Sequence, residues 1–259
     1  MHSIFRLGDT LAARFRLQGD EVGLVRSELQ MEAAAAHEVI GRTRFATPEP
    51  VAIGEPGEGY PLPWSVQTWI EGDVALDADP SESSFFATDL AEFINGVRSI
   101  DTRGRTYNGK GRGGDLKSHD AWVYKCLAHS EGLLDVAALR RIWEVLRELP
   151  RGDKPDMMNH GDLIPGNILV SNGRLTGVLD TGDLAPADPA LDLVSAWHLL
   201  EAEPRRVLHE HLDTDDQEWE RGRAWAFQQA IGLVWYYVDS NPVLSQVGRK
   251  TLERIAADD

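Results

Sequence analysis

The segment from His160 to Leu193 constrains the fold most, because it places carboxylates beside apolar runs that favour burial. It reads HGDLIPGNILVSNGRLTGVLDTGDLAPADPALDL. The runs ILV and LTGVLD are rich in aliphatic residues and are typical of buried strands. The Asn172-Gly173 pair between them is typical of a hairpin turn. We therefore expect a β-hairpin whose ends carry acidic side chains next to a hydrophobic core.

Three polar side chains should meet at one end of this hairpin. Asp162 precedes Asn167 by five positions, and Asp180 follows Asn167 by thirteen. A tight loop, a strand, a turn and a returning strand would bring the three together. Oxygen ligands of this kind suit Mg²⁺, which usually completes its shell with waters and substrate phosphates. Phosphoryl transfer uses such a metal together with a carboxylate that accepts the proton of the attacking hydroxyl.

The part of the chain before this segment divides into two regions. Residues 1–70 contain a predicted hairpin around Gly8-Asp9, a helix that ends at Gly41, and two extended runs around a Gly/Pro turn. From about Pro80 onward, apolar residues recur at helical intervals. This pattern predicts a small lobe with a sheet and one helix, followed by a mainly helical region.

Composition narrows the classes of function. The chain has 26 Lys and Arg against 42 Asp and Glu, a formal net charge of -16, which argues against partners such as nucleic acid or a membrane surface. The charge would favour a cationic small molecule, but solubility explains it equally well, so the charge does not select a function. No apolar run approaches the roughly 20 residues of a membrane span. The lone Cys126 cannot form an intrachain disulfide. We expect a cytoplasmic protein, and the sequence gives no oligomeric state.

Several motifs together resemble the aminoglycoside phosphotransferase family of kinase-like small-molecule kinases. They are HGDLIPGNILV, GVLDTGD and ADPALDL, with RLGDTLAARFRL and PLPWSVQTWIEGD before them, and the similarity extends over nearly the whole chain. The resemblance implies an α+β, bilobal protein-kinase-like fold, with an N-terminal nucleotide-binding lobe over 1–70 and a catalytic and acceptor-binding lobe over 71–259. It also implies Mg²⁺, ATP or GTP as phosphate donor, and a small-molecule hydroxyl acceptor. Aminoglycosides, with a role in antibiotic resistance, macrolides, sugars and amino alcohols remain open as acceptors.

The resemblance assigns roles around the hairpin. Asp162 corresponds to the catalytic base, Asn167 to a ligand of Mg²⁺, and Asp180 to the carboxylate that bridges the metal and the nucleotide phosphates. His160, Asp188 and Asp192 correspond to residues that support the loop. Asp188 stands before Pro189 and also suits a helix N-cap.

The resemblance also assigns a nucleotide site to the first lobe. Arg14 corresponds to the basic residue that contacts the phosphates. Glu32 corresponds to its ion-pair partner, with Glu28 as a rival for that role. The backbone of Thr68, Trp69 and Ile70 corresponds to the hinge that binds adenine.

Three departures from the family pattern bear on activity. Family members usually have another strand and a glycine-rich or Ser/Asn-containing turn before the RLG strand, whereas this chain starts at Met1. We therefore expect a truncated first lobe and a phosphate lid that is short or missing. Ile164 replaces a frequent histidine or lysine, and Thr181 a frequent aromatic residue. Together these differences are compatible with a weakened or lost activity, or with a start codon that has been assigned incorrectly.

Three functions are compatible with the sequence. The first is a small-molecule O-phosphotransferase. The second is a kinase-like protein that binds a nucleotide or ligand without catalysis, which the short N-terminus favours and the complete set of Asp162, Asn167 and Asp180 disfavours. The third is a metal-dependent phosphohydrolase, which commonly recruits histidines, whereas only His160 lies near the carboxylates in the sequence.

Overall fold

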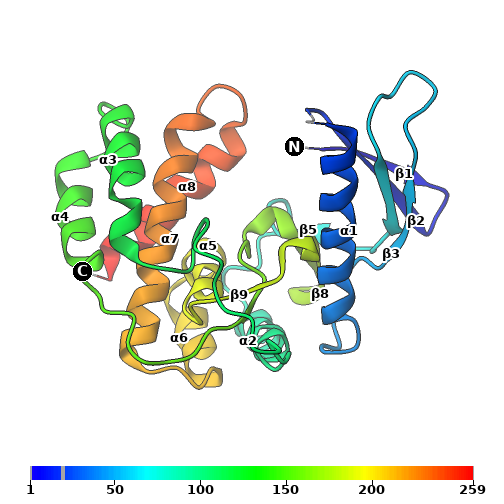
Figure 1. The fold of residues 1–259 in the computed structure, drawn as a ribbon. Helices are drawn as coiled ribbons and strands as arrows, with labels where there is room; N and C mark the ends of the chain where they lie inside the picture. Colours follow the sequence, from blue (N-terminus) through cyan, green and yellow to red (C-terminus); the bar gives the residue numbers. More distant parts are fainter. Residues whose placement is uncertain (1, 19–20, 259) are drawn as a thin grey trace.

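A computed structural model describes residues 2–18 and 21–258. Figure 1 shows two lobes, a small one built from strands and helix α1 and a larger one built mostly from helices. The predicted α+β, bilobal arrangement is confirmed.

The small lobe consists of a four-stranded antiparallel sheet and one helix. The strands are β1 (His2–Leu7), β2 (Leu11–Arg16), β3 (Pro50–Gly54) and β4 (Trp64–Thr68), in the spatial order β1-β2-β4-β3. Gly8 has φ +60° in the turn between β1 and β2, where Leu7 pairs with Leu11. Helix α1 (Val22–Val39) contacts β3 and β4. The predicted hairpin, helix and paired extended runs are therefore present.

The connection between the lobes follows β4. Strand β5 (Asp73–Val74) pairs with β7 of the large lobe. The few residues between β4 and β5 therefore join two separate sheets. The boundary at residues 70 and 71 stays a prediction.

The polar segment folds as the expected hairpin. Strands β7 (Ile168–Ser171) and β8 (Arg174–Val178) are antiparallel, and Ile168 pairs with Val178. Asn172 and Gly173 have φ +51° and +68°, the left-handed pair that a two-residue hairpin turn requires. A second pair of strands, β6 (Met157–Asn159) and β9 (Ala185–Ala187), precedes and follows this hairpin in the sequence.

Helices form most of the large lobe, and α7 lies at their centre (Figure 1). The fully buried tryptophans Trp143, Trp197 and Trp225 contribute to their common core. Of the described residues, no helix is both long and apolar enough to cross a bilayer. The helices are α2 (Ser84–Arg98), α3 (Asp120–His129), α4 (Val136–Leu146), α5 (Val194–Leu199), α6 (Ala202–His211), α7 (Asp216–Tyr236) and α8 (Pro242–Ala257). Short 3₁₀ turns are η1 (Leu116–His119), η2 (Pro165–Asn167), η3 (Thr181–Asp183) and η4 (Leu191–Leu193).

Candidate active site

The loop after β6 is held by a buried carboxylate. Asp192 accepts the backbone N–H of His160 at 2.8 Å and that of Gly161 at 2.7 Å. The His160 ring contacts the carbonyl of Leu179 at 2.9 Å. Burial raises the pKa of Asp192, and the two backbone donors act against that shift. His160 and Asp192 thus lie where they can fix the loop that presents Asp162.

The predicted base and the first predicted metal ligand are in direct contact. The Asn167 amide nitrogen donates to the Asp162 carbonyl at 2.9 Å and to its carboxylate Oδ2 at 3.0 Å. Because the nitrogen is used in this way, Oδ1 is the atom through which Asn167 would bind a cation. The 3₁₀ turn η2 places Asn167 immediately before β7, so the spacing of five residues closes a compact loop.

Two residues that sequence reasoning did not find also contact Asp162. Arg112 donates from Nη2 to Asp162 Oδ1 at 3.0 Å, and Gln229 donates from Nε2 to the same oxygen at 2.6 Å. They come from the glycine-rich run NGKGRGGD and from helix α7. The sequence features that could have indicated these two residues are that run and a glutamine within a largely buried helix.

Gln229 is itself oriented by a buried histidine. His198 Nε2 lies 3.2 Å from Gln229 Oε1, and its Nδ1 lies 2.9 Å from the Thr251 hydroxyl. Burial, followed by the charge of Arg112, lowers the pKa of His198 to about 4. The ring is therefore neutral near pH 7. Its Nε2 faces the Gln229 amide oxygen, and the amide nitrogen faces Asp162.

The carboxylates after β8 form an anionic cluster with Asp162. Asp180 adopts a left-handed backbone conformation, φ +60° and ψ +43°, between β8 and η3. Asp183 keeps contact with solvent, yet its pKa is raised by the desolvation that the surrounding protein imposes and then by the charges of Asp180 and Asp162. All three line one cavity of about 560 Å³. An excess of negative charge with an amide oxygen beside it fits a hard divalent cation.

That cation would need more than side-chain carboxylates. Within residues 2–18 and 21–258, no group of three or more His, Cys, Asp or Glu side chains is arranged to hold a metal ion alone.

Arg14 links the small lobe to this cluster. Its Nη2 lies 2.9 Å from Asp180 Oδ1, whereas its Nη1 lies 4.0 Å from Glu32. Glu32 is closer to Arg16, at 3.0 Å, and Glu28 contacts Arg16 as well. The predicted partners Arg14 and Glu32 are brought together. The distance between them is longer than the distance from Arg14 to Asp180 or from Glu32 to Arg16. Glu28 does not compete for Arg14.

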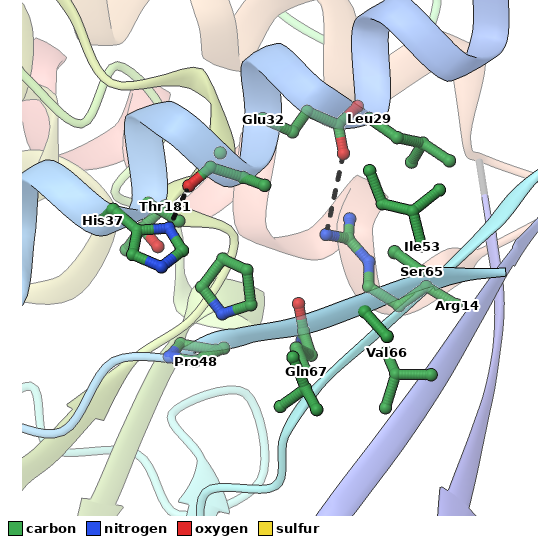
Figure 2. A pocket seen from close by; sticks show the side chains of 16 residues that line it. Arg14, Leu29, Glu32, His37, Pro48, Ile53, Ser65, Val66, Gln67 and Thr181 are labelled. Carbon is green, nitrogen blue, oxygen red and sulfur yellow. Dashed lines mark hydrogen bonds and ion pairs between the residues drawn. The ribbon is translucent and has the colours of Figure 1, made fainter.

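A cavity of about 310 Å³ lies between α1 and the strands β3 and β4, and both Arg14 and Glu32 line it. Figure 2 shows their side chains facing one another across this space. Thr68, Trp69 and Ile70 are absent from its lining. The backbone N–H groups of Thr68 and Trp69 bond to the carbonyls of Glu49 and Thr10 at 2.9 and 2.8 Å. Adenine binding by this segment stays a prediction. The N–H groups of Thr68 and Trp69 are already bonded within the protein and are not available to adenine.

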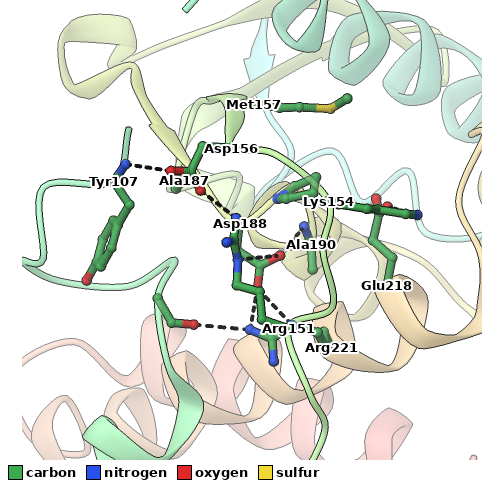
Figure 3. Close-up of polar contacts among 12 residues, drawn as sticks. Tyr107, Arg151, Lys154, Asp156, Met157, Ala187, Asp188, Ala190, Glu218 and Arg221 are labelled. Carbon is green, nitrogen blue, oxygen red and sulfur yellow. Dashed lines mark hydrogen bonds and ion pairs between the residues drawn. The ribbon is translucent and has the colours of Figure 1, made fainter. Parts of the chain in front are cut away.

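Asp188 lies at the centre of a buried network rather than at a helix N-terminus (Figure 3). Its Oδ2 accepts from Arg221 Nε at 2.9 Å and from Trp225 Nε1 at 3.1 Å. Its Oδ1 accepts the Ala190 N–H at 3.1 Å. The contact from the Ala190 N–H to Oδ1 is of the kind that an N-cap makes. The turn that follows, η4, begins at Leu191 with Ala190 as its own N-cap, so Asp188 does not stand directly at a helix start.

The departures from the family pattern have different surroundings. Thr181 is buried and lines the cavity beside α1. Ile164 precedes η2, so the loop between Asp162 and Asn167 carries no cation at that position. The shortened lid stays a prediction, and Met1, on which it depends, lies outside the described residues.

Comparisons with known proteins identify the family. The model of the phosphotransferase enzyme family (APH) matches residues 4–225. An aminoglycoside 3'-phosphotransferase of Streptomyces fradiae is 41% identical over 83 residues, which cover 28% of this chain and 31% of that relative. The match therefore spans about a third of the length of the curated relative.

Solved structures share the fold over nearly the whole chain. A complex of APH(2")-IIia with GDP and kanamycin has a TM-score of 0.69 at 19% identity, covering 100% of this chain and 90% of that one. A macrolide 2'-phosphotransferase, MphH of Brachybacterium faecium, has a TM-score of 0.62 at 16% identity, covering 96% and 88%. Because the family model matches most of the chain and the fold agrees, this protein belongs to the phosphotransferase enzyme family.

Proposed function

We propose that the protein transfers the terminal phosphate of ATP or GTP to a hydroxyl of a small molecule, with Mg²⁺. The observation that carries the proposal is the meeting of Asp162, Asp180 and Asp183 in one cavity, with Asn167 bonded to Asp162. A carboxylate for the attacking hydroxyl and oxygen ligands for a metal are the two groups that phosphoryl transfer requires.

Asp162 is the proposed base. The acceptor oxygen forms a bond to the terminal phosphorus, the bond from phosphorus to the bridging oxygen breaks, and the acceptor proton passes to the Asp162 carboxylate. Gln229 and Asn167 hold that carboxylate by both oxygens, which limits its rotation. Fixed orientation of this kind supplies much of the rate enhancement when little covalent chemistry is needed.

The metal would be held by Asn167 and Asp180. When bound, Mg²⁺ neutralises the negative charge of the nucleotide phosphates. Arg14 lies against Asp180 and lines the cavity beside α1, so its guanidinium is placed to contact phosphates held by the same carboxylate. Support for a nucleotide donor also comes from the structural neighbour solved with GDP.

The acceptor is proposed by class. The relatives are named for aminoglycosides and macrolides, and one is solved with kanamycin. A net charge of -16 favours the approach of cationic molecules such as aminoglycosides. A cytoplasmic location, where ATP and GTP are present, belongs to the same proposal.

An acceptor panel tests the function. Purified protein is incubated with ATP or GTP labelled at the terminal phosphate, with Mg²⁺ or with EDTA, and with aminoglycosides, macrolides, sugars or amino alcohols. Labelled acceptor that appears only with Mg²⁺ is the expected result. Nucleotide binding without transfer to any acceptor would contradict the proposal and support the ligand-binding alternative. Phosphate release from substrates other than nucleotides would support a phosphohydrolase.

A further inference from the structure

We propose that Arg112 is a catalytic residue that binds the phosphoryl group during transfer, supplied by a loop distant in sequence from the catalytic segment. The inference rests on the proposed function and adds a residue to it. Arg112 lines the same cavity as Asp162, Asp180 and Asp183. Its guanidinium lies 3.0 Å from the carboxylate that would receive the acceptor proton.

The Arg112 guanidinium has N–H donors that its contact with Asp162 does not use. Nη2 is used on Asp162, whereas Nη1 is shielded from solvent and has no hydrogen-bond partner among the described residues. A buried donor without an acceptor is unfavourable. An anionic oxygen that enters beside Asp162 would satisfy it after a small rotation of the planar group. A guanidinium can then bridge the base and a phosphate oxygen, because it presents several N–H groups along one edge.

The distribution of charges in the site favours a cation beside Asp162. In the transfer step, negative charge spreads over the equatorial oxygens of the moving group. Arg14 is engaged with Asp180, and Ile164 brings no charge to the catalytic loop. Lys110 also lines the cavity. Arg112 is the cation that contacts the base itself, and its fork matches phosphate geometry better than an ammonium does.

The loop that carries Arg112 is anchored on both sides. Asp188 donates its N–H to the Gly113 carbonyl at 3.0 Å, and Arg221 donates to the Gly114 carbonyl at 3.1 Å. The Tyr107 hydroxyl donates to the Gly111 carbonyl at 2.6 Å.

Gly113 has φ +103°, and a Cβ there would come within 2.6 Å of Ala187. Packing this close to β9 fixes the distance between the loop and the catalytic segment. A cation held in place before the reaction stabilises developing charge without reorganisation.

The experiment uses a mimic of the transferring group, so it does not require the acceptor. Thermal unfolding is measured with Mg²⁺ and ADP or GDP, and then with aluminium fluoride added. We expect fluoride to raise the midpoint of wild type beyond the shift from nucleotide alone. In R112Q, the nucleotide shift should stay and the additional fluoride shift should be lost. R141Q, a matched change on the exposed side of α4, should behave as wild type.

Kinetics with any acceptor found in the panel separate catalysis from binding. R112Q should lower kcat by about 10²- to 10³-fold, with the nucleotide KM changed by less than about threefold. R112K keeps the charge without the fork and should show an intermediate kcat. Guanidinium ion added to R112A should restore part of the rate. If R112Q is poorly folded, R112K is compared with wild type instead, and a smaller loss of kcat is expected.

Two results with R112Q would overturn the inference, and so would two results with the wild-type protein. One is an R112Q variant with the fluoride shift and turnover of wild type. The other concerns the additional shift in unfolding midpoint that aluminium fluoride causes. If R112Q lowers this shift in the wild-type background but has no effect on it in the D162N background, Arg112 acts only by positioning Asp162. A wild-type protein that shows no shift with Mg²⁺ and nucleotide would overturn the proposed function and this inference with it. A nucleotide shift that fluoride does not increase would overturn the inference alone.

Discussion

Gln229 on helix α7 donates a 2.6 Å hydrogen bond to Asp162, 67 positions earlier in the chain. The bond ties the central helix of the large lobe to the catalytic loop. Because buried His198 contacts the other end of the Gln229 amide, Asp162, the proposed base, is oriented by the helical core as well as by its own loop.

Replacing Gln229 tests this orientation. Q229E would place a second carboxylate against Asp162, and like charges at this distance raise the pKa of a base. We expect kcat to fall about tenfold or more at pH 7 and to recover partly as pH rises. A pH profile of kcat measures this. Q217E, an exposed change at the start of the same helix, controls for added charge. A pH profile unchanged in Q229E would contradict the role assigned to Gln229.

His198 should make stability depend on pH. Its pKa falls from 6.5 to about 4 on folding, mainly through burial. Between these values the unfolded chain binds more protons at His198 than the folded chain does. The contribution of His198 to the free energy of unfolding is therefore fully present above pH 6.5 and is lost as pH falls toward 4. The contribution is about 3 kcal/mol. His2 shifts in the same direction, so the informative quantity is a difference between variants.

Urea unfolding between pH 7 and 4 measures that difference. H198Q should show a flatter dependence of unfolding free energy on pH than wild type. H211Q, at an exposed position on α6, should keep the wild-type slope. Equal slopes for wild type and H198Q would show that His198 is not held neutral.

The Asp188–Arg221 ion pair is expected to be important for stability. Both side chains are 2% exposed, so D188A would leave Arg221 charged and buried without its carboxylate. Breaking a buried pair in this way typically costs about 3–5 kcal/mol. Denaturant unfolding measures the loss. E210Q, which removes an exposed ion pair with Arg206, should be close to wild type, and a similar small effect for D188A would contradict the prediction.

Asp180 should couple nucleotide binding to the metal. D180N removes a carboxylate from the proposed Mg²⁺ site, and charge count strongly affects the affinity of oxygen ligands for hard cations. Isothermal titration of ATP or GTP with and without Mg²⁺ should show that the gain from Mg²⁺ in wild type is lost in D180N. D258N, near the end of α8 and paired with Arg205, should keep the gain. A full Mg²⁺ effect in D180N would place the metal elsewhere.

The elements of the fold that the sequence predicted are those with local causes. Gly8 and the Asn172-Gly173 pair determine two turns through left-handed backbone conformations that neighbouring residues cannot easily adopt. The convergence of Asp162 and Asn167 also has a local cause, since five residues in a 3₁₀-containing loop separate them. The helices after Pro80 followed from periodicity alone.

The rest depends on packing between distant segments. Arg112 and Gln229 lie 50 and 67 positions from Asp162, and neither belongs to a motif with a fixed offset from it. The sharing of Glu32 between Arg14 and Arg16 depends on how α1 sits against β2, which periodicity does not specify. The use of Asp188 Oδ2 by buried Arg221 and Trp225 could not be predicted either, because both residues lie more than 30 positions away.

The comparison of wild type with D162N tests the central claim most directly. Transfer of labelled terminal phosphate from ATP or GTP to the best acceptor of the panel, and the Kd of the Mg²⁺–nucleotide complex, are measured for both proteins. We predict that D162N loses about 10²- to 10⁴-fold in kcat while its nucleotide Kd stays within about threefold of wild type. Transfer by D162N at the wild-type rate would contradict the assignment of Asp162 as the base and, with it, the mechanism built on this site.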